Sequence, residues 1–268
     1  MQFKSVFALL SVLAVSSSAS PLRRRCSNDT IPTPTDTAPA PPAESTPVTT
    51  PVLPTTGSGT QLAGPDTATL KHILVGHGIQ NYTCTAAGAT AASIGALAVV
   101  WDITPLYPAS SSSSLSAADF DQLTSKVLRT TSIPLNLAAD GSGGADVGSP
   151  FPAPADLTIE GVSGAMKFLG HHFFDEAGTP TFDLSGAGDG ELFKGKKDAG
   201  VSAPADADKG ADPETGAVDW LRLSDKGTST GVSLVYRVLT AGGNPEPCTE
   251  AGQAQSIPYA AQYWVYAN

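Results

Sequence analysis

Residues 74–84, LVGHGIQNYTC, are the first stretch that suggests chemistry, because Gly76 and Gly78 flank His77 directly after an apolar run. Glycines at this spacing can hold a nucleotide phosphate when they follow a strand and open a helix. Here Asn81 occupies the position of the third glycine, and the residues after it are typical of a strand, so no helix N-terminus would face a phosphate. The stretch therefore predicts a strand, a turn at Gly76–Gly78 and a second strand, and we expect no nucleotide or other cofactor.

The four histidines are the next residues that could do chemistry. No two of them have the H-x-x-x-H spacing of a zinc site, so no metal site is predicted. His171 and His172 would point to opposite faces of a strand. His77 could nevertheless meet His171 and an acid such as Asp102 in the folded protein, which makes these three residues the candidates for a catalytic site. The alternative is that the histidines are partly buried and hydrogen-bonded.

Sugar binding is the other chemistry that the residue types allow. Trp101, Trp220 and Tyr236 are candidate ligand-binding residues, because aromatic rings on neighbouring strands can stack on sugar rings. On alternating strands such rings are also typical core residues. Acidic residues are scattered through the chain, and the sequence does not show which two could meet at the separation that a glycosidase needs. No G-x-S-x-G motif lies between a predicted strand and a predicted helix, where it would place a nucleophilic serine on a sharp turn.

These residues would be positioned mainly by strands. Residues 94–103, IGALAVVWDI, form a nearly continuous apolar run, which is typical of a strand buried on both faces. Residues 116–130 favour a short helix, in which Ser116 could cap and Asp119 could complete a capping box. The fold class predicted is all-β, a β-sandwich or barrel-like fold with one or two short helices and a disulfide. Alternating or short apolar segments predict further strands within residues 169–185, 218–224, 232–240 and 260–268.

The three cysteines indicate an oxidising compartment and one disulfide. Cysteines of an exported protein are expected to pair where geometry allows. Cys84 and Cys248 lie near the two ends of the region predicted to fold, so we expect a bridge between them. Cys26 lies in a segment without structure signals, and three fates stay open for it: free, removed by processing or paired with another chain.

The N-terminal part of the chain has the layout of an export signal. Residues 1–20 contain a short apolar run followed by small residues, which predicts a signal peptide cut after Ala19. Residues 21–65 are predicted to be a pro-segment followed by a Pro/Thr/Ser-rich stalk without a packed core. Within them, Arg23–Arg25 is either a processing site or a basic tail. Residues 66–268 would then form a single globular β-rich domain.

Charge and sequons narrow the location and the partners. The formal net charge is −10, and it becomes −14 without the first 25 residues, which carry four basic residues and no acid. Nucleic acid and anionic membranes are therefore unfavourable partners, and no later stretch is apolar enough to span a membrane. Asn28 and Asn81 each begin an N-glycosylation sequon, and Asn81 would stay unmodified if its strand were buried. These features predict a secreted glycoprotein that is extracellular or associated with a cell wall.

Several motifs together resemble a known family. They are LVGHGIQNYTC, GHHFFDEAGTPTFDL, VDWLRLSDKGTSTGVSLVYRVLTAGGNPEPC and IPYAAQYWVYAN. In this order they resemble the secreted fungal and bacterial proteins of domain-of-unknown-function family 3455, over most of residues 65–268. The resemblance implies an exported, β-rich, single-domain protein and carries over no catalytic residue.

Members of that family are often labelled malate dehydrogenase by automatic transfer. That activity requires a nicotinamide site, a histidine held by an aspartate, and arginines for two carboxylates. This chain has six arginines, of which three lie in the predicted pro-segment, and it lacks the dinucleotide-binding pattern. An NAD-dependent dehydrogenase is therefore not expected.

Taken together, these observations favour a secreted binding or interaction module whose partner is a cell-wall polysaccharide or another extracellular protein. The alternative is an extracellular enzyme of unassigned class, acting on polysaccharide, that uses His77 or His171 with nearby acids. The two hypotheses differ in what they expect of the fold. An enzyme needs these histidines and an acid in one cleft, and a sugar-binding module needs an accessible surface for the ligand.

Overall fold

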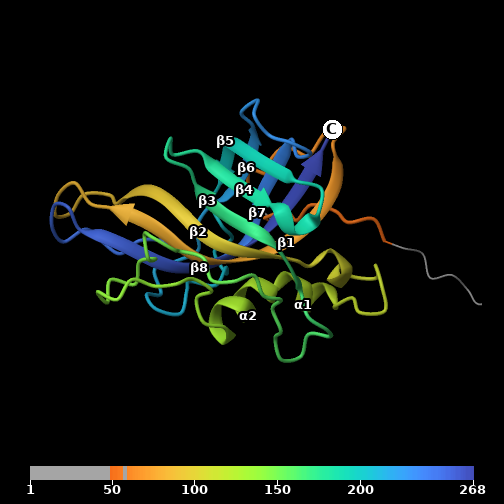
Figure 1. Ribbon diagram of the computed structural model, residues 1–268, viewed down its shortest axis with the longest axis horizontal. Helices are drawn as coiled ribbons and strands as arrows, with labels where there is room; N and C mark the ends of the chain where they lie inside the picture. The colour runs from red at the N-terminus through yellow and green to blue at the C-terminus, as the bar shows by residue number, and fades with distance from the viewer. Residues whose placement is uncertain (1–48, 57–58) are drawn as a thin grey trace, which may run out of the picture. The chain divides into compact units, whose positions relative to one another are not determined.

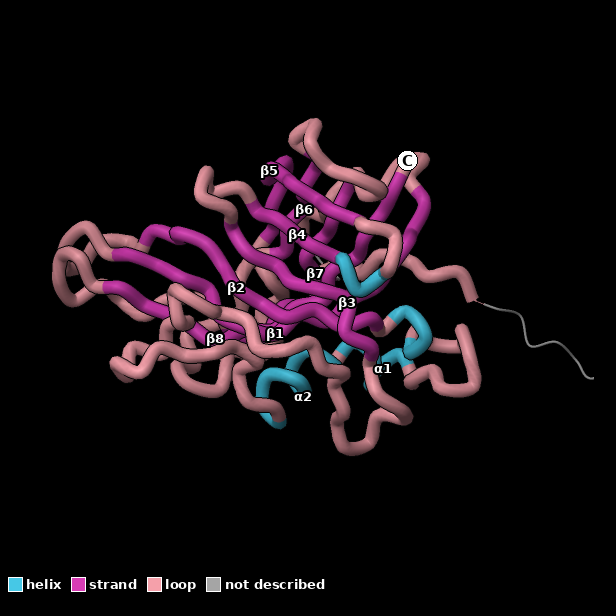
Figure 2. Tube along the Cα trace, in the orientation of Figure 1, coloured by secondary structure: helices cyan, strands magenta, loops and turns pink. Residues whose placement is uncertain are grey.

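A computed structural model describes residues 49–56 and 59–268 of the chain. In this part, eight antiparallel strands follow one another in chain order and close into a barrel, with β8 paired to β1 (Figures 1 and 2). The prediction of an all-β, barrel-like fold with short helices and a disulfide is confirmed. The predicted signal peptide, together with Cys26 and Asn28, lies outside the described residues. The strands are β1 (Thr69–Thr83), β2 (Ala92–Asp102), β3 (Lys167–Phe174), β4 (Pro180–Leu184), β5 (Glu191–Val201), β6 (Trp220–Asp225), β7 (Leu234–Gly242) and β8 (Ala254–Ala267).

The barrel wall is apolar on both of its faces, because β1, β2 and β8 pack on two separate cores. On β1, Leu74 belongs to the core inside the barrel, whereas Ile73 and Val75 belong to the core outside it. The inner core consists of residues from the strands and the adjoining loop, among them Phe182 and Tyr263. The outer core is completed by helices and loops that cover the wall. A strand that is buried on both faces needs apolar residues at successive positions, which explains the continuous apolar run in β2.

The predicted turn at Gly76–Gly78 is wrong, because β1 continues through both glycines as one strand. The glycines are needed for close packing. A Cβ atom on Gly76 would lie 2.6 Å from Cε2 of Tyr263, and one on Gly78 would lie 2.7 Å from the Cα atom of Ala98. Both positions therefore let the ring of Tyr263 and the backbone of β2 approach β1 at distances that a larger residue would block.

Two short helices, α1 (Ala117–Asp121) and α2 (Leu123–Thr130), cover part of the outer core and meet at Gln122. The predicted cap is present: Ser116 Oγ accepts a hydrogen bond from the Asp119 backbone N–H at 3.1 Å. Four apolar side chains of the two helices are buried against the wall, and α2 packs on β1, β7 and β8 below the barrel in Figure 1. Two 3-10 turns, η1 (Thr104–Leu106) and η2 (Ser185–Ala187), complete the regular structure of the described residues. The four buried apolar side chains are those of Phe120, Leu123, Val127 and Leu128.

The part of the predicted stalk that is described, residues 49–56 and 59–65, contacts the barrel. Leu53 and Leu62 are partly buried against the outer core. The Tyr236 hydroxyl donates a hydrogen bond to the Ala63 carbonyl at 2.7 Å, across 173 positions of sequence. These contacts attach the segment that precedes β1 to the wall.

Candidate functional site

His77 lies on the outer face of β1 and is 1% exposed. Its Nδ1 is 2.8 Å from the Tyr259 carbonyl, which can only accept, so Nδ1 carries the proton and donates it. Burial lowers the pKa of His77, and the carbonyl groups of Tyr259 and Thr131 act in the opposite direction. Nε2 is buried and makes no hydrogen bond with a described residue by distance and angle, although the Thr131 carbonyl lies near the ring. His77 is therefore a neutral histidine enclosed in the wall.

His171 lies on the same outer face as His77, but Val99 stands between them. His77 pairs with Val99, and Val99 pairs with His171, so the two histidines are two strands apart. Neighbouring strands are about 4.8 Å apart, which puts the two residues about 10 Å from each other. The His171 ring is stacked on Phe151, with ring centroids 4.0 Å apart. Burial lowers the pKa of His171, and the nearby charge of Asp183 opposes that shift.

Asp102 does not join either histidine. It pairs with Leu74, three residues from His77 along β1, which corresponds to about 10 Å along the strand. Its Oδ1 accepts a hydrogen bond from the Thr104 backbone N–H at 2.8 Å. Within the described part of the chain, histidine, cysteine and acidic side chains nowhere gather as a group of three that could hold a metal ion. The structure therefore keeps the three candidate catalytic residues apart.

His172 points to the inner face, opposite to His171, as the sequence predicts. It stacks on Phe182 with ring centroids 4.1 Å apart, and its Nδ1 is 2.9 Å from the Thr181 carbonyl. Complete burial lowers the pKa of His172 to about 4. This histidine is part of the inner core.

The three aromatic residues predicted as a sugar-stacking surface are buried. Trp101, Trp220 and Tyr236 are 4%, 2% and 0% exposed and belong to the outer core. The indole N–H of Trp101 donates to the Ala155 carbonyl at 2.8 Å. None of the three rings offers a free face, so these side chains contribute packing where a platform was expected.

The predicted disulfide is present between Cys84 and Cys248, whose Cα atoms are 5.6 Å apart. Cys84 directly follows β1, and the bridge ties it to the loop before β8. Backbone bonds reinforce the link, because the Cys84 N–H donates to Gln253 and the Cys84 carbonyl accepts from Gly252. The bridge therefore holds the far end of the β1–β8 ladder.

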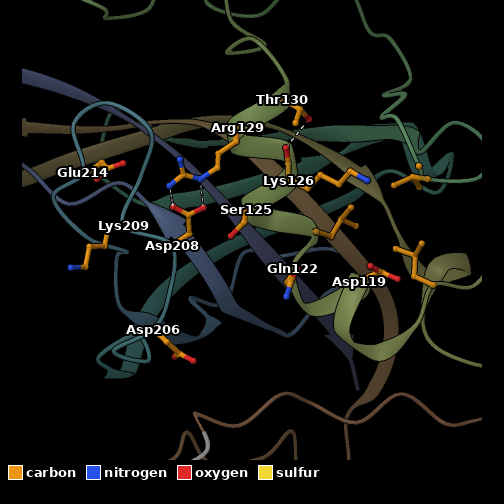
Figure 3. Close-up of a pocket in the computed structure, with 14 residues that line it drawn as sticks. Asp119, Gln122, Ser125, Lys126, Arg129, Thr130, Asp206, Asp208, Lys209 and Glu214 are labelled. Carbon is orange, nitrogen blue, oxygen red and sulfur yellow. Dashed lines mark hydrogen bonds and ion pairs between the residues drawn. The ribbon is translucent and has the colours of Figure 1, made fainter.

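A cleft of about 790 Å³ lies outside the barrel, beside α1 and α2 (Figure 3). Its other side is formed by the loop of residues 206–214, and Gly161 and Val162 contribute to its edge. Ten of its fourteen lining residues are polar or charged, and none is aromatic. The volume lies within the range of small-ligand sites in proteins. The polar lining consists of Asp119, Gln122, Ser125, Lys126, Arg129, Thr130, Asp206, Asp208, Lys209 and Glu214.

One ion pair fixes the loop to the helix. The Arg129 guanidinium donates from Nε and Nη2 to the two carboxylate oxygens of Asp208 at 2.7 and 2.6 Å. The same group donates to the Gly210 carbonyl at 3.0 Å. Hydrogen bonding from Arg129 lowers the pKa of Asp208 and raises the pKa of the guanidinium. A bidentate pair fixes orientation as well as distance, so it defines the width of the cleft.

Other side chains of the cleft are free to meet a ligand. Lys126 and Lys209 form no ion pair with a described residue, and Asp206 and Glu214 are exposed. The cleft thus combines ammonium, carboxylate, amide and hydroxyl groups. Lys126 also borders a smaller hollow of about 480 Å³ on its other side, which shares Thr130 and Gly161 with the cleft. The two hollows adjoin each other at the C-terminal end of α2.

Sequence reasoning did not find this cleft. Gln122 at the start of α2 and the helix residues Ser125, Lys126 and Arg129 have the i, i+3, i+4, i+7 spacing, which places them on one face of the helix. This spacing is the sequence feature that indicates a polar surface on the helix side of the cleft. The loop gives no comparable signal, because Asp208 is 79 positions from Arg129.

Comparison with known proteins places the chain in a family. The family model described as "Protein of unknown function (DUF3455)" matches residues 65–267, so the chain belongs to that family. No curated protein and no solved structure matches the chain. Among residues 49–56 and 59–268, no helix is long and apolar enough to cross a membrane.

Proposed function

We propose that this protein is an extracellular binding module whose cleft beside α2 takes a hydroxyl-rich ligand of the oligosaccharide class. The observation that carries the proposal is the polar cleft itself, of about 790 Å³, with its loop held by the Arg129–Asp208 pair. Secretion is supported by the apolar N-terminal run of the sequence and by the Cys84–Cys248 disulfide, since disulfides form and persist in oxidising compartments.

The composition of the cleft favours sugar hydroxyls. A hydroxyl group donates and accepts, so it can bond to carboxylates such as Glu214 and to donors such as Lys126 within one site. Hydrogen bonds to charged groups contribute more than those between neutral groups. Three cationic and four anionic side chains line the cleft, so a neutral ligand can bond to both kinds without bringing an unpaired charge. The second hollow shares Lys126, Thr130 and Gly161 with the cleft, and two adjoining hollows suit a chain of sugar units.

Isothermal titration with short neutral oligosaccharides of glucose, mannose and N-acetylglucosamine tests the proposal. We expect one of these series to bind. Replacing Glu214 by Gln removes a charged hydrogen-bond partner, which should weaken binding by roughly tenfold, the equivalent of about 1.5 kcal/mol.

Glu250→Gln is the matched control, because Glu250 is also exposed and lies outside the cleft. Its affinity should equal that of the wild type. Binding that is equally strong in Glu214→Gln, Gln122→Ala and the control would contradict this site. Chromatography of the oligosaccharide after incubation should show an unchanged chain length, and shortened chains would indicate an enzyme.

A further inference from the structure

A third hollow lies elsewhere on the molecule, between the outer face of the β1–β2–β8 sheet and the loop of residues 142–150. Its volume is about 430 Å³. The floor includes Asn81 on β1, Leu97 on β2 and Ser256 on β8, and Val147 and Pro150 line the loop side. More of its lining is apolar than is the case for the cleft, and Val147 is 98% exposed.

Asn81 is oriented in this hollow by a neighbouring strand. Its Oδ1 accepts a hydrogen bond from Ser256 Oγ at 2.8 Å, and the side chain is half-buried. Fixing the oxygen of a carboxamide also fixes the direction of its nitrogen. Nδ2 makes no hydrogen bond with any described residue. This atom is the one that an N-linked glycan modifies.

We propose that Asn81 carries an N-linked glycan whose first sugar lies in the hollow. The sequon is Asn81-Tyr82-Thr83. In the transfer step, Nδ2 attacks C1 of a lipid-linked sugar diphosphate, the N–C1 bond forms, and the bond between C1 and the phosphate oxygen breaks. The lipid diphosphate leaves, and the amide nitrogen loses one proton. The acceptor chain reacts before it folds, so burial of the strand in the folded protein does not prevent the step.

The hollow suits an N-acetylhexosamine in shape and chemistry. Leu97, Val147 and Pro150 offer apolar surface to the sugar ring and the acetyl methyl group, and Asp146 and Ser142 offer oxygens at the rim. The sugar would also cover Val147, which is otherwise one of the largest exposed apolar groups. Asn81 was expected to stay unmodified if its strand were buried, but its half-buried side chain lines the hollow on the outer face of β1. This inference rests on the extracellular location in the proposed function.

The test is expression of the full chain in a eukaryotic secretory host, with purification from the medium. Amidase release in heavy-oxygen water followed by peptide mapping should convert Asn81 to an Asp that carries the label. Thr83→Ala should abolish this label, and Thr83→Ser should keep it. Asn28→Gln should leave it unchanged.

Exported protein with unmodified Asn81 overturns the proposal and leaves the extracellular location intact. Protein that is retained in the cell and unmodified contradicts both. A second measurement tests the placement of the sugar. It compares the rates at which the amidase releases the glycan from the folded and from the denatured Asn28→Gln protein. If the linkage becomes accessible only when the chain opens locally, release from the folded protein should be about tenfold or more slower. Equal rates would overturn the placement in the hollow.

Discussion

The barrel wall and the cleft beside α2 both contain groups that can donate, accept or exchange protons, but the two regions expose these groups differently. In the wall, His77 and His172 are enclosed by strands, and each uses one nitrogen on a backbone carbonyl. In the cleft, Lys126 and Glu214 lie on a helix and a loop and keep their charged ends free of ion pairs with described residues. The histidines of the wall are thus part of the packing, whereas the charged groups of the cleft lie outside the barrel, where a ligand can reach them.

Removing the disulfide should have the largest effect on the wall. The Cys84→Ala/Cys248→Ala protein loses a cross-link that closes a loop of 164 residues. In the chain-entropy model this lowers the free energy of unfolding by about 4 to 5 kcal/mol. Urea unfolding followed by tryptophan fluorescence measures it, and a loss below about 1 kcal/mol would show that the bridge contributes little.

His172 should make the wall sensitive to acid. Its pKa is about 4 in the folded protein and 6.5 as the ordinary value, so below pH 6.5 the unfolded chain binds a proton that the folded chain does not. The contribution of neutral His172 to the free energy of unfolding is complete above pH 6.5. It is lost as the pH falls toward 4, and the total loss is roughly 3 kcal/mol.

Unfolding free energies of wild type and His172→Phe at several pH values measure this effect. Phenylalanine keeps a ring against Phe182 and cannot titrate. The slope of the unfolding free energy against pH should therefore be smaller in the variant, by up to about 1.4 kcal/mol per pH unit. The buried His77 and the half-buried His171 stay in both proteins and serve as an internal control. Identical slopes in the two proteins would rule out His172 as a source of acid sensitivity.

Gly76 tests the close packing of the wall. A methyl group in Gly76→Ala would lie 2.6 Å from a carbon atom of the Tyr263 ring, and overpacking of this kind costs about 1 to 3 kcal/mol. Gly64→Ala is the control, because the added Cβ meets nothing within 4 Å. Thermal unfolding of both variants measures the difference, and equal midpoints would argue against a packing role for Gly76.

Of these changes, removal of the Arg129–Asp208 ion pair should have the smallest effect on the free energy of unfolding. Its effect on oligosaccharide affinity should be larger. Arg129→Met removes a partly exposed pair, and because solvent screens such pairs its loss should change the free energy of unfolding little. Amide exchange in residues 206–214 should become faster, and oligosaccharide affinity should fall, because the loop is no longer fixed. Lys167→Met is the control, since it removes the exposed Lys167–Asp156 pair outside the cleft. Equal exchange rates in the two variants would mean that Arg129 does not hold the loop.

Much of the wall could be predicted from the sequence, because its signals are local. The apolar run of β2 and the Ser116 cap depend on neighbouring residues, and both elements form as predicted. β5 was missed because Lys196 and Lys197 face solvent and interrupt its apolar pattern. At Gly76 the local signal was misleading, since the ring that requires a glycine is that of Tyr263, far along the chain.

The cleft could not be predicted in the same way, because it depends on contacts between distant parts of the chain. Gln122 and Arg129 have the spacing of one helix face, but nothing in residues 206–214 indicates that this loop meets the helix. The carboxylate of Asp208 and the backbone of Gly210 must be brought to Arg129 by the fold. A site assembled by such contacts leaves no pattern in the local sequence.

The most direct test of the central claim is a map of ligand contacts by amide NMR during titration with the oligosaccharide that binds best. We expect the shifts to be concentrated in residues 122–130, 160–162 and 206–214, and we expect none around His77, His171 and Asp102. Shifts centred on those three residues, with the cleft unaffected, would contradict the proposed site and would show that the oligosaccharide binds at the barrel wall.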